Sequence, residues 1–512
     1  MNKGKINHAK RFAAILGIAI LINMAFYRLP DSIFDIPVKK VDLLSDIRIT
    51  SSNDENLFAE IPDSEFSGTD NINLKGAIGE GTESQAISKG ASIGETASQA
   101  DTKTPDANSG ETANPANSKT SGANGGDTNS SPRNESRNNT NYLTNKNIED
   151  FTPGHNGLHR FFSALDNIDR LGRPVRIAFL GDSFIEGDIL VADFRAKMQE
   201  QFGGRGVGFV PVTSITAQYR PTVKQSATGW KSYSILKDKN RKYVLSGFLF
   251  EPASNDASLQ FQTVDSYPGL EEVSSLKFIY DRNVAAEMIF KNDNETLSYK
   301  LPPTEVVTQF ELKGRFRKGT LQFKNSKGLR ALGIALEDNH GVVVDNFSIR
   351  GNSGASLSVL DSNSCRDLQQ IRPYDLIVLQ YGLNVASESV REYSWYRNKM
   401  VSVIEHIHEC FPDADILVLG VSDRSRNGRS TMPAVLSLLR AQRQMAERTE
   451  VAFWSIFAAM GGQNSMVKYV NSNWASKDYT HLRFRGGREI AYALYDALIT
   501  EKILYDEQLV EK

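Results

Sequence analysis

The sequence predicts an α/β domain with a parallel sheet that is interrupted by an all-β insert. Three short apolar runs bounded by turn residues are typical of buried strands, namely Val175–Leu180, Asp375–Gln380 and Asp415–Gly420. Helical patterns lie between and after them, over Tyr396–Cys410 and Met432–Glu447. Strands that alternate with helices in this way indicate a parallel sheet.

The insert is predicted by a change of pattern between about residues 217 and 342. Apolar and polar residues alternate strictly there, as at Leu259 and Phe261 or at Leu321 and Phe323. Many short strands with turn residues between them indicate a β-sandwich or jelly roll. Further runs add to the strand count: Tyr243–Phe250, Leu276–Tyr280 and Val342–Val344. We therefore expect the α/β domain in two parts, 151–216 and 343–505, around an insert at 217–342.

Residues 1–28 resemble an export and anchoring segment. Four basic residues precede an uncharged apolar run, Phe12–Tyr27, which Arg28 closes. As a helix this run would span about 24 Å, slightly less than a typical bilayer core. No small-residue cleavage site follows it, which favours an uncleaved anchor over a removable signal peptide. Basic residues before the run predict a single-pass inner or plasma membrane protein whose folded part lies on the periplasmic or extracytoplasmic side.

Residues 29–150 are predicted to form a disordered linker. From about Thr50 to Asn145 the composition shifts to Ser, Thr, Asn, Gly, Ala and Asp, with almost no aromatic residues. Such a segment cannot bury enough apolar surface to offset its ordering entropy. It is expected to act as a flexible stalk.

Composition excludes several classes of function. The 512-residue chain has a formal net charge of −2 with well-mixed charges, so no basic surface for nucleic acid is predicted. Its two cysteines, Cys365 and Cys410, could pair as a disulfide or remain as buried thiols, and both readings stay open. No zinc-ligand spacing occurs, so no metal or organic cofactor is expected. No pattern in the sequence predicts an oligomeric state.

The first motif with chemical content is Gly181-Asp182-Ser183, directly after the strand Val175–Leu180. A serine at that point lies just beyond the carboxyl edge of a parallel sheet, where the functional sites of open α/β folds usually lie. Its backbone amide can also stabilise a developing oxyanion. Taken alone, the triplet favours an ordinary helix cap at Asp182 or Ser183 over a catalytic serine.

The second motif is Asp478-Tyr479-Thr480-His481, which precedes the last helical pattern. A serine hydroxyl needs a base, and a histidine whose tautomer is fixed by a carboxylate is suited to that task. The alternative is a surface histidine beside a capping aspartate. His481 is favoured because the remaining histidines lie in the tail, in the insert or on a helix: His8, His155, His159, His340, His406 and His408.

Two further positions could supply oxyanion donors. Asn384 follows the strand Asp375–Gln380 in Gly382-Leu383-Asn384, and its amide is a neutral donor. Gly354 lies where the insert returns to the α/β domain, and its backbone amide could be another donor. An ordinary turn glycine is the alternative for Gly354, and Gly351 is a rival for the role.

These four blocks, in this order, resemble the SGNH (GDSL-type) hydrolase superfamily. The resemblance covers about 172–215 and 345–500, and it implies a flavodoxin-like three-layer sandwich and a carboxylic ester hydrolase. It implies Ser183 as nucleophile and His481 as base with Asp478 as its partner. The implied oxyanion donors are Ser183, Gly354 and Asn384. Two departures are Phe184, where leucine is frequent, and the basic stretch 482–485 after the histidine. Asp423 is a rival of Asp478 for the role of the acid. We favour instead a structural role for Asp423, in a local turn or in a salt bridge with Arg424.

The resemblance extends to the domain arrangement. An exported esterase with a β-sandwich after the first βα unit is similar to bacterial O-acetylesterases of peptidoglycan or other polysaccharides. The segment Arg205–Pro211 resembles the one that precedes the insert in such proteins. This implies an acylated glycan as substrate and a carbohydrate-binding insert, whose alternative is a lid or packing domain. Two other functions remain open: an O-acetyltransferase with the same triad, and a non-catalytic envelope scaffold.

Overall fold

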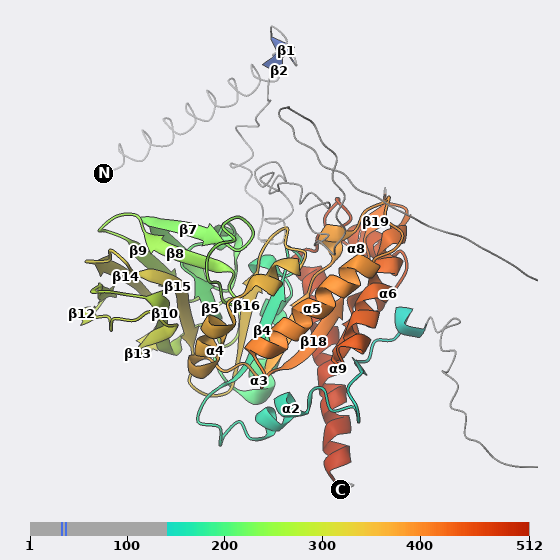
Figure 1. The fold of residues 1–512 in the computed structure, drawn as a ribbon, viewed down its shortest axis with the longest axis horizontal. Helices are drawn as coiled ribbons and strands as arrows, with labels where there is room; N and C mark the ends of the chain where they lie inside the picture. Colours follow the sequence, from blue (N-terminus) through green and yellow to red (C-terminus); the bar gives the residue numbers. More distant parts are fainter. Residues whose placement is uncertain (1–31, 34–35, 38–140, 427, 511–512) are drawn as a thin grey trace, which may run out of the picture.

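The computed structural model describes residues 32–33, 36–37, 141–426 and 428–510 (Figure 1). The predicted anchor at 1–28 and most of the predicted linker lie outside these residues. Ser32–Ile33 (β1) and Ile36–Pro37 (β2) pair antiparallel. Within the described ranges, no helix combines the length and the apolarity that a bilayer crossing requires.

A mostly parallel sheet forms the centre of the larger domain. Its strand order is β16-β4-β17-β18-β21-β3, and only β3 at the edge runs antiparallel. The five parallel strands follow the flavodoxin-like order, in which the first strand lies between the second and the third. The α/β prediction is therefore confirmed. The bounds are β3 (Glu149–Asp150), β4 (Val175–Gly181), β16 (Val342–Ser348), β17 (Leu376–Gln380), β18 (Asp415–Gly420) and β21 (Ala452–Ser455).

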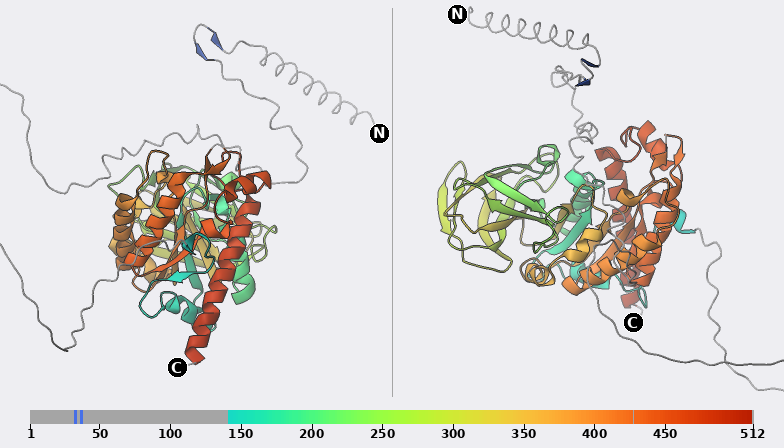
Figure 2. Two further views of the ribbon diagram at one scale, coloured as in Figure 1. Left: turned by 90° about the vertical axis from the view of Figure 1, so that its right-hand side faces the viewer. Right: turned by 45° about the horizontal axis from the view of Figure 1, so that its top comes forward.

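Helices cover both faces of this sheet (Figure 2). Helices α3 and α9 pack together on one face, and α4, α5 and α6 lie on the other. The α-helices are α2 (His159–Asp166), α3 (Val191–Phe202), α4 (Ser362–Ile371), α5 (Ser394–Cys410), α6 (Pro433–Arg448), α7 (Ile456–Ala459), α8 (Ser465–Asn471) and α9 (Phe484–Val510). Short 3₁₀ turns are η4 (Asn141–Leu143), η5 (Glu186–Asp188), η6 (Ala217–Tyr219), η7 (Ala355–Val359) and η8 (Leu383–Val385). A small hairpin joins β19 (Ser425–Arg426) to β20 (Ser430–Thr431).

The insert is a sandwich of two antiparallel sheets, which we call the β module. One sheet has the order β13-β10-β15-β8-β7, with β5 also paired to β15, and the other has the order β12-β11-β14-β9-β6. Phe278 and Phe323, from different sheets, meet with ring centroids 4.8 Å apart inside the sandwich. The strands are β5 (Gly208–Pro211), β6 (Lys224–Thr228), β7 (Trp230–Ser234), β8 (Phe248–Pro252), β9 (Ser258–Gln262), β10 (Val273–Arg282), β11 (Glu287–Lys291), β12 (Thr296–Lys300), β13 (Thr308–Phe316), β14 (Lys318–Lys324) and β15 (Arg330–Glu337).

Four segments differ from the sequence-based expectation. Val342–Val344, expected in the insert, begins β16, which pairs in parallel with β4. Gly208–Pro211, expected in the α/β domain, is β5 of the β module. In the run Tyr243–Phe250 only the last residues are strand, because β8 begins at Phe248. Residues 141–150, expected in the linker, contain η4 and β3.

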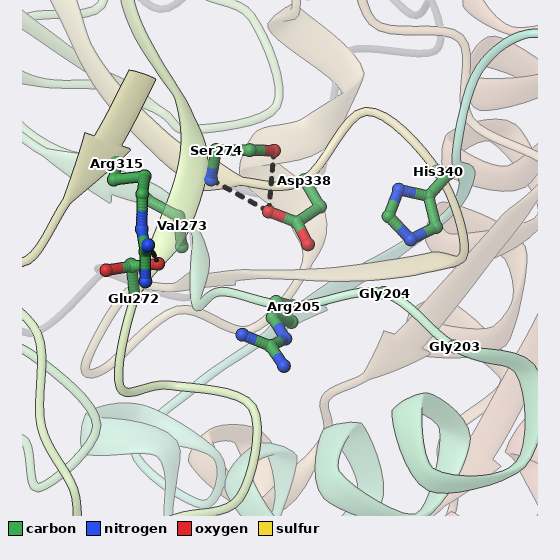
Figure 3. Close-up of a pocket in the computed structure, with 9 residues that line it drawn as sticks. All are labelled: Gly203, Gly204, Arg205, Glu272, Val273, Ser274, Arg315, Asp338 and His340. Carbon is green, nitrogen blue, oxygen red and sulfur yellow. Dashed lines mark hydrogen bonds and ion pairs between the residues drawn. The ribbon is translucent and has the colours of Figure 1, made fainter. Parts of the chain in front are cut away.

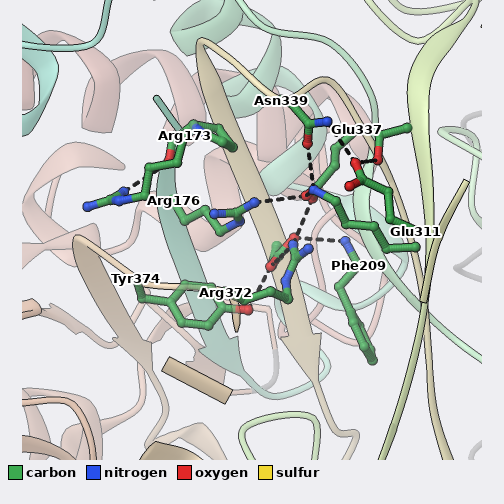
Figure 4. A network of polar contacts seen from close by, with 12 residues as sticks. Arg173, Arg176, Phe209, Glu311, Glu337, Asn339, Arg372 and Tyr374 are labelled. Atoms are coloured by element: carbon green, nitrogen blue, oxygen red, sulfur yellow. Dashed lines mark hydrogen bonds and ion pairs between the residues drawn. The ribbon is translucent and has the colours of Figure 1, made fainter. Parts of the chain in front are cut away.

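A buried network of charges joins the two domains (Figure 4). Glu337, at the end of β15, accepts hydrogen bonds from Arg176 (2.9 Å), Lys277 (2.7 Å) and Arg372 (2.9 Å). Arg372 also donates to Asp345 on β16 at 2.7 Å. Buried charges are tolerated only when they are paired, so this network is expected to hold the β module rigidly against the α/β sheet.

The network predicts a loss of stability in acid. Burial opposes ionisation of Glu337, but the charges of Arg372, Arg176 and Lys277 outweigh it and hold the pKa of Glu337 well below its usual range. A folded-state pKa below the unfolded value of about 4.3 stabilises the fold fully above that value, and the stabilisation is lost as the pH falls through the folded pKa. Denaturant unfolding between about pH 7 and 3 is expected to show a falling free energy of unfolding. Glu337→Gln should flatten this slope, and an unchanged slope would contradict the account.

Candidate active site

Ser183 lies just beyond the carboxyl end of β4, in the turn that the G-D-S motif forms. A Cβ on Gly181 would come within 2.6 Å of Ile185 and 2.8 Å of the Gln380 amide oxygen, so these two buried side chains would have to shift for a larger residue. Asp182 Oδ1 accepts the Phe184 N–H at 2.9 Å and closes the turn. Local geometry thus places the serine at the edge of the sheet, as the motif predicts.

The structure brings Ser183, His481 and Asp478 together, although Ser183 and His481 are 298 positions apart. Ser183 Oγ lies 3.0 Å from His481 Nε2, and His481 Nδ1 lies 2.6 Å from Asp478 Oδ2. Asp478 Oδ1 accepts the backbone N–H groups of Thr480 (2.9 Å) and His481 (3.0 Å). The carboxylate is therefore fixed by the turn that it begins, directly before α9.

The electrostatics of the contacts between Ser183, His481 and Asp478 favour proton transfer from the serine. Burial raises the pKa of Asp478, but the hydrogen bond with His481 and the charge of that ring outweigh burial and lower it overall. An ionised Asp478 accepts a hydrogen bond from the Nδ1–H group, which keeps the proton on Nδ1 and leaves Nε2 as the acceptor for the Ser183 hydroxyl. This is the arrangement that activates a serine nucleophile.

Asn384 is held beside the nucleophile by two hydrogen bonds. It lies in η8, just after β17, and its Nδ2 donates to Asp182 Oδ2 at 2.8 Å and to the Asn352 carbonyl oxygen at 3.0 Å. Asp182 is fully buried, and burial raises its pKa to about 6 although the Phe184 N–H lowers it. Asp182 therefore both shapes the serine turn and orients the Asn384 amide.

Gly354 occupies a turn that requires glycine. Its φ is +90°, and a Cβ there would lie 2.9 Å from Met400 and 3.0 Å from Tyr381. Its N–H donates to Asn352 Oδ1 at 3.0 Å. The rival Gly351 also has a positive φ, of 77°.

The three implied oxyanion donors thus differ in their hydrogen-bond partners. The Ser183 N–H makes no hydrogen bond to any residue in the described ranges, whereas Asn352 accepts from both Gly354 and Asn384. An oxyanion would compete with Asn352 for these two donors. Asn352 is almost fully buried and Asp182 is buried too, and the sequence motifs did not reveal either as an organiser of the site. The only signal was their position inside the G-D-S and Gly354 blocks.

The other residues singled out in the sequence lie outside this constellation. Asp423 is buried, and its Oδ2 accepts the Met466 N–H at 2.8 Å in α8. Within the described part of the chain it forms no ion pair with Arg424, contrary to one expectation. Cys365 and Cys410 are both buried and carry free thiols. No group of His, Cys, Asp and Glu side chains in the described residues is arranged to bind a metal ion.

The chain is similar to known proteins in its three-dimensional structure. No protein-family model and no curated protein matches the chain. A solved peptidoglycan O-acetylesterase matches it with a TM-score of 0.56 and 22% identity, over 69% of this chain and 99% of the other. The chain has the SGNH esterase fold.

Two further solved structures match with lower TM-scores. A family-two carbohydrate esterase from Cellvibrio japonicus has 12% identity and a TM-score of 0.24 over 55% of this chain and 98% of its own. A lipase/acylhydrolase from Enterococcus faecalis has 14% identity and a TM-score of 0.23 over 31% and 75%. At these scores neither match supports an argument. In the SGNH fold of this chain, the constellation around Ser183 lies at the carboxyl edge of the sheet.

Proposed function

We propose that the chain is an extracytoplasmic serine esterase that removes O-acetyl or other short acyl groups from peptidoglycan or another envelope polysaccharide. The observation that carries this proposal is the continuous chain of contacts from Ser183 Oγ through the His481 ring to Asp478, at 3.0 and 2.6 Å. A hydroxyl, imidazole and carboxylate in this order perform acyl transfer on unrelated folds. The likeness of fold to an O-acetylesterase supports the same reaction class.

The proposed reaction proceeds in two steps. Ser183 Oγ attacks the ester carbonyl carbon while His481 Nε2 takes its proton, and the protonated ring then donates that proton to the leaving alcohol. Water, deprotonated by His481, next attacks the acyl-serine, and the ring returns that proton to Ser183 Oγ as the acid is released. Asp478 holds the ring and stabilises the imidazolium. The Ser183 N–H is ready to bind the oxyanion, and Gly354 and Asn384 bind it as their bonds to Asn352 are exchanged.

Replacement of Asn384 by alanine is expected to lower kcat about a hundredfold, because one oxyanion donor contributes about 3 kcal/mol of transition-state stabilisation. KM should change little, since the donor acts mainly on the charge that develops during reaction. The measurement is steady-state hydrolysis of p-nitrophenyl acetate. Asn363→Ala, at an exposed position of α4, is the matched control. A kcat for Asn384→Ala within threefold of the wild-type value would remove Asn384 from the oxyanion site.

The polysaccharide substrate and the location are supported by other features. The basic and apolar residues of 1–28 favour export, and the fold is similar to that of a peptidoglycan O-acetylesterase. The test is acetate release from O-acetylated peptidoglycan by the full chain, with Ser183→Ala and chemically deacetylated polymer as controls. Acetate release only by the wild-type chain supports the proposal. Transfer of acetyl to an added acceptor glycan without acetate release would assign the chain to acyltransferases instead.

A further inference from the structure

The β module carries a basic hollow of about 790 Å³ near its junction with the α/β domain. Six basic side chains line it, from the loop after β7 and from the ends of β10 and β15: Lys237, Lys239, Arg241, Lys242, Arg282 and Arg330. Only three acidic side chains share the lining, Asp238, Asp281 and Glu305. The basic hollow therefore has an excess of positive charge.

Much of this charge is available to a ligand. Lys237, Lys239 and Lys242 are exposed, and none of them forms an ion pair with a residue that the structure describes. Of the three acidic side chains, Asp281 is already paired with Arg330 at 2.6 Å. Outside the lining, Asp361 interacts electrostatically with Lys242. The three lysines thus present to solvent a positive charge that no ion pair among the described residues neutralises.

The loop that carries Lys237, Lys239 and Lys242 is hydrogen-bonded to the segment that follows Gly354. Tyr243, directly after Lys242, is fully buried, and its carbonyl oxygen accepts the Asp361 N–H at 2.9 Å. Asp361 lies seven residues after Gly354, and η7 fills most of that interval. At about 2 Å per residue within the 3₁₀ turn and at most about 3.6 Å per residue for the other three steps, the two points are at most about 19 Å apart along the chain. A polymer with several sugar units can span that interval.

The loop after β7 lies on the same side of the molecule as Ser183. A Cβ on Gly247, in that loop, would lie 2.5 Å from Ile349, and the Ile349 N–H donates to the Gly181 carbonyl oxygen at 2.9 Å, two residues before Ser183. The turn between β15 and β16 lies at the amino end of β16, the opposite end of that strand. A second hollow, shown in Figure 3, contains Gly203 and His340 and lies at the turn itself, where Val342 donates to the Gly203 carbonyl. That second hollow is at the opposite edge from Ser183.

We propose that the basic hollow binds anionic groups of the polymer whose ester is cleaved at Ser183, so that the substrate is an acidic, O-acylated polysaccharide. This inference rests on the proposed esterase function. Carboxylates and phosphates share the required charge, and the lysines bind either one. Exposed charges act mainly by raising the local concentration of the polymer, an effect that salt screens.

The test compares two triple variants of the full chain. One replaces Lys237, Lys239 and Lys242 by glutamate. The control replaces three exposed lysines of the β module, Lys224, Lys300 and Lys324, with the same change in charge. For each variant, kcat/KM on O-acetylated polygalacturonate and on an O-acetylated neutral glucan is divided by its own kcat/KM on p-nitrophenyl acetate.

The hollow variant is expected to lose on the order of tenfold in the ratio for the acidic polymer at low salt. It should lose less than twofold in the ratio for the neutral polymer, and the control variant should keep both ratios. High salt should remove the difference. Equal losses on both polymers, or equal losses in both triple variants, would overturn the inference. Competition by polygalacturonate or by poly(glycerol phosphate) distinguishes carboxylate from phosphate ligands, and equal competition by a neutral glucan would also overturn it.

Direct binding separates this inference from the esterase proposal. Calorimetric titration of polygalacturonate into the Ser183→Ala variant measures binding at the basic hollow in the absence of catalysis. Binding that weakens at least tenfold in the Lys237, Lys239 and Lys242 variant supports the hollow even if the wild-type chain cleaves no ester. Binding that is equal in both triple variants overturns the hollow even if the esterase is active.

Discussion

Replacement of Ser183 by alanine is expected to lower kcat/KM for p-nitrophenyl acetate by about 10⁴- to 10⁶-fold, because it removes the hydroxyl that lies 3.0 Å from His481 Nε2. His481→Ala should cause a loss of similar size. The double variant should be no worse than either single one, since the two residues act as a unit. Steady-state kinetics on the purified full chain measure all three.

The matched control is Ser254→Ala, at an exposed position of the β module. It should retain wild-type kinetics. A Ser183→Ala chain with more than a tenth of the wild-type rate would show that the hydrolysis does not use this serine. Losses that multiply in the double variant would show that Ser183 and His481 do not act through the 3.0 Å contact.

Replacement of Arg372 by alanine is expected to destabilise the fold by about 3 to 5 kcal/mol, because it leaves Glu337 and Asp345 buried with one cation fewer. Both carboxylates lie within 2.9 Å of this guanidinium, which is itself 1% exposed. Urea unfolding at pH 7 measures the change. Since Arg372 joins the β module to the α/β domain, the loss should be seen by probes in both domains.

An exposed ion pair provides the control for Arg372. Arg315 is 85% exposed and lies 2.8 Å from Glu272. Arg315→Ala should change the free energy of unfolding by less than about 1 kcal/mol, as is typical of surface pairs. If the two alanine variants were equally stable, the buried network would not be what holds the domains together.

The parts of the fold that follow from local patterns were predictable. Val175–Leu180 and Asp415–Gly420 are apolar, bounded by turn residues and spaced by helical patterns, and both are strands of the parallel sheet. Val342–Val344 was misplaced because a short apolar run reads alike in a sandwich and in a parallel sheet. Only its pairing with β4 decides between them. The pairing of Gly208–Pro211 with β15 is likewise a long-range contact without a local signal.

The candidate site, too, was only partly predictable from the sequence. Ser183, Asp478 and His481 stand in short motifs whose spacing reflects their chemistry, and the structure brings them together. Asn352 has no such motif, because its contacts with Gly354 and Asn384 depend on how two separate loops meet. The oxyanion donors could therefore be predicted from the sequence. Asn352, which accepts hydrogen bonds from two of them, could not.

The most direct test of the proposed mechanism is covalent labelling of the full chain with a fluorophosphonate, followed by peptide mass spectrometry. We expect a single phosphonyl adduct on Ser183, formed with loss of fluoride, and almost none in His481→Ala. An adduct on another residue of the wild-type chain, or labelling of Ser183 that is unaffected by loss of His481, would contradict the account.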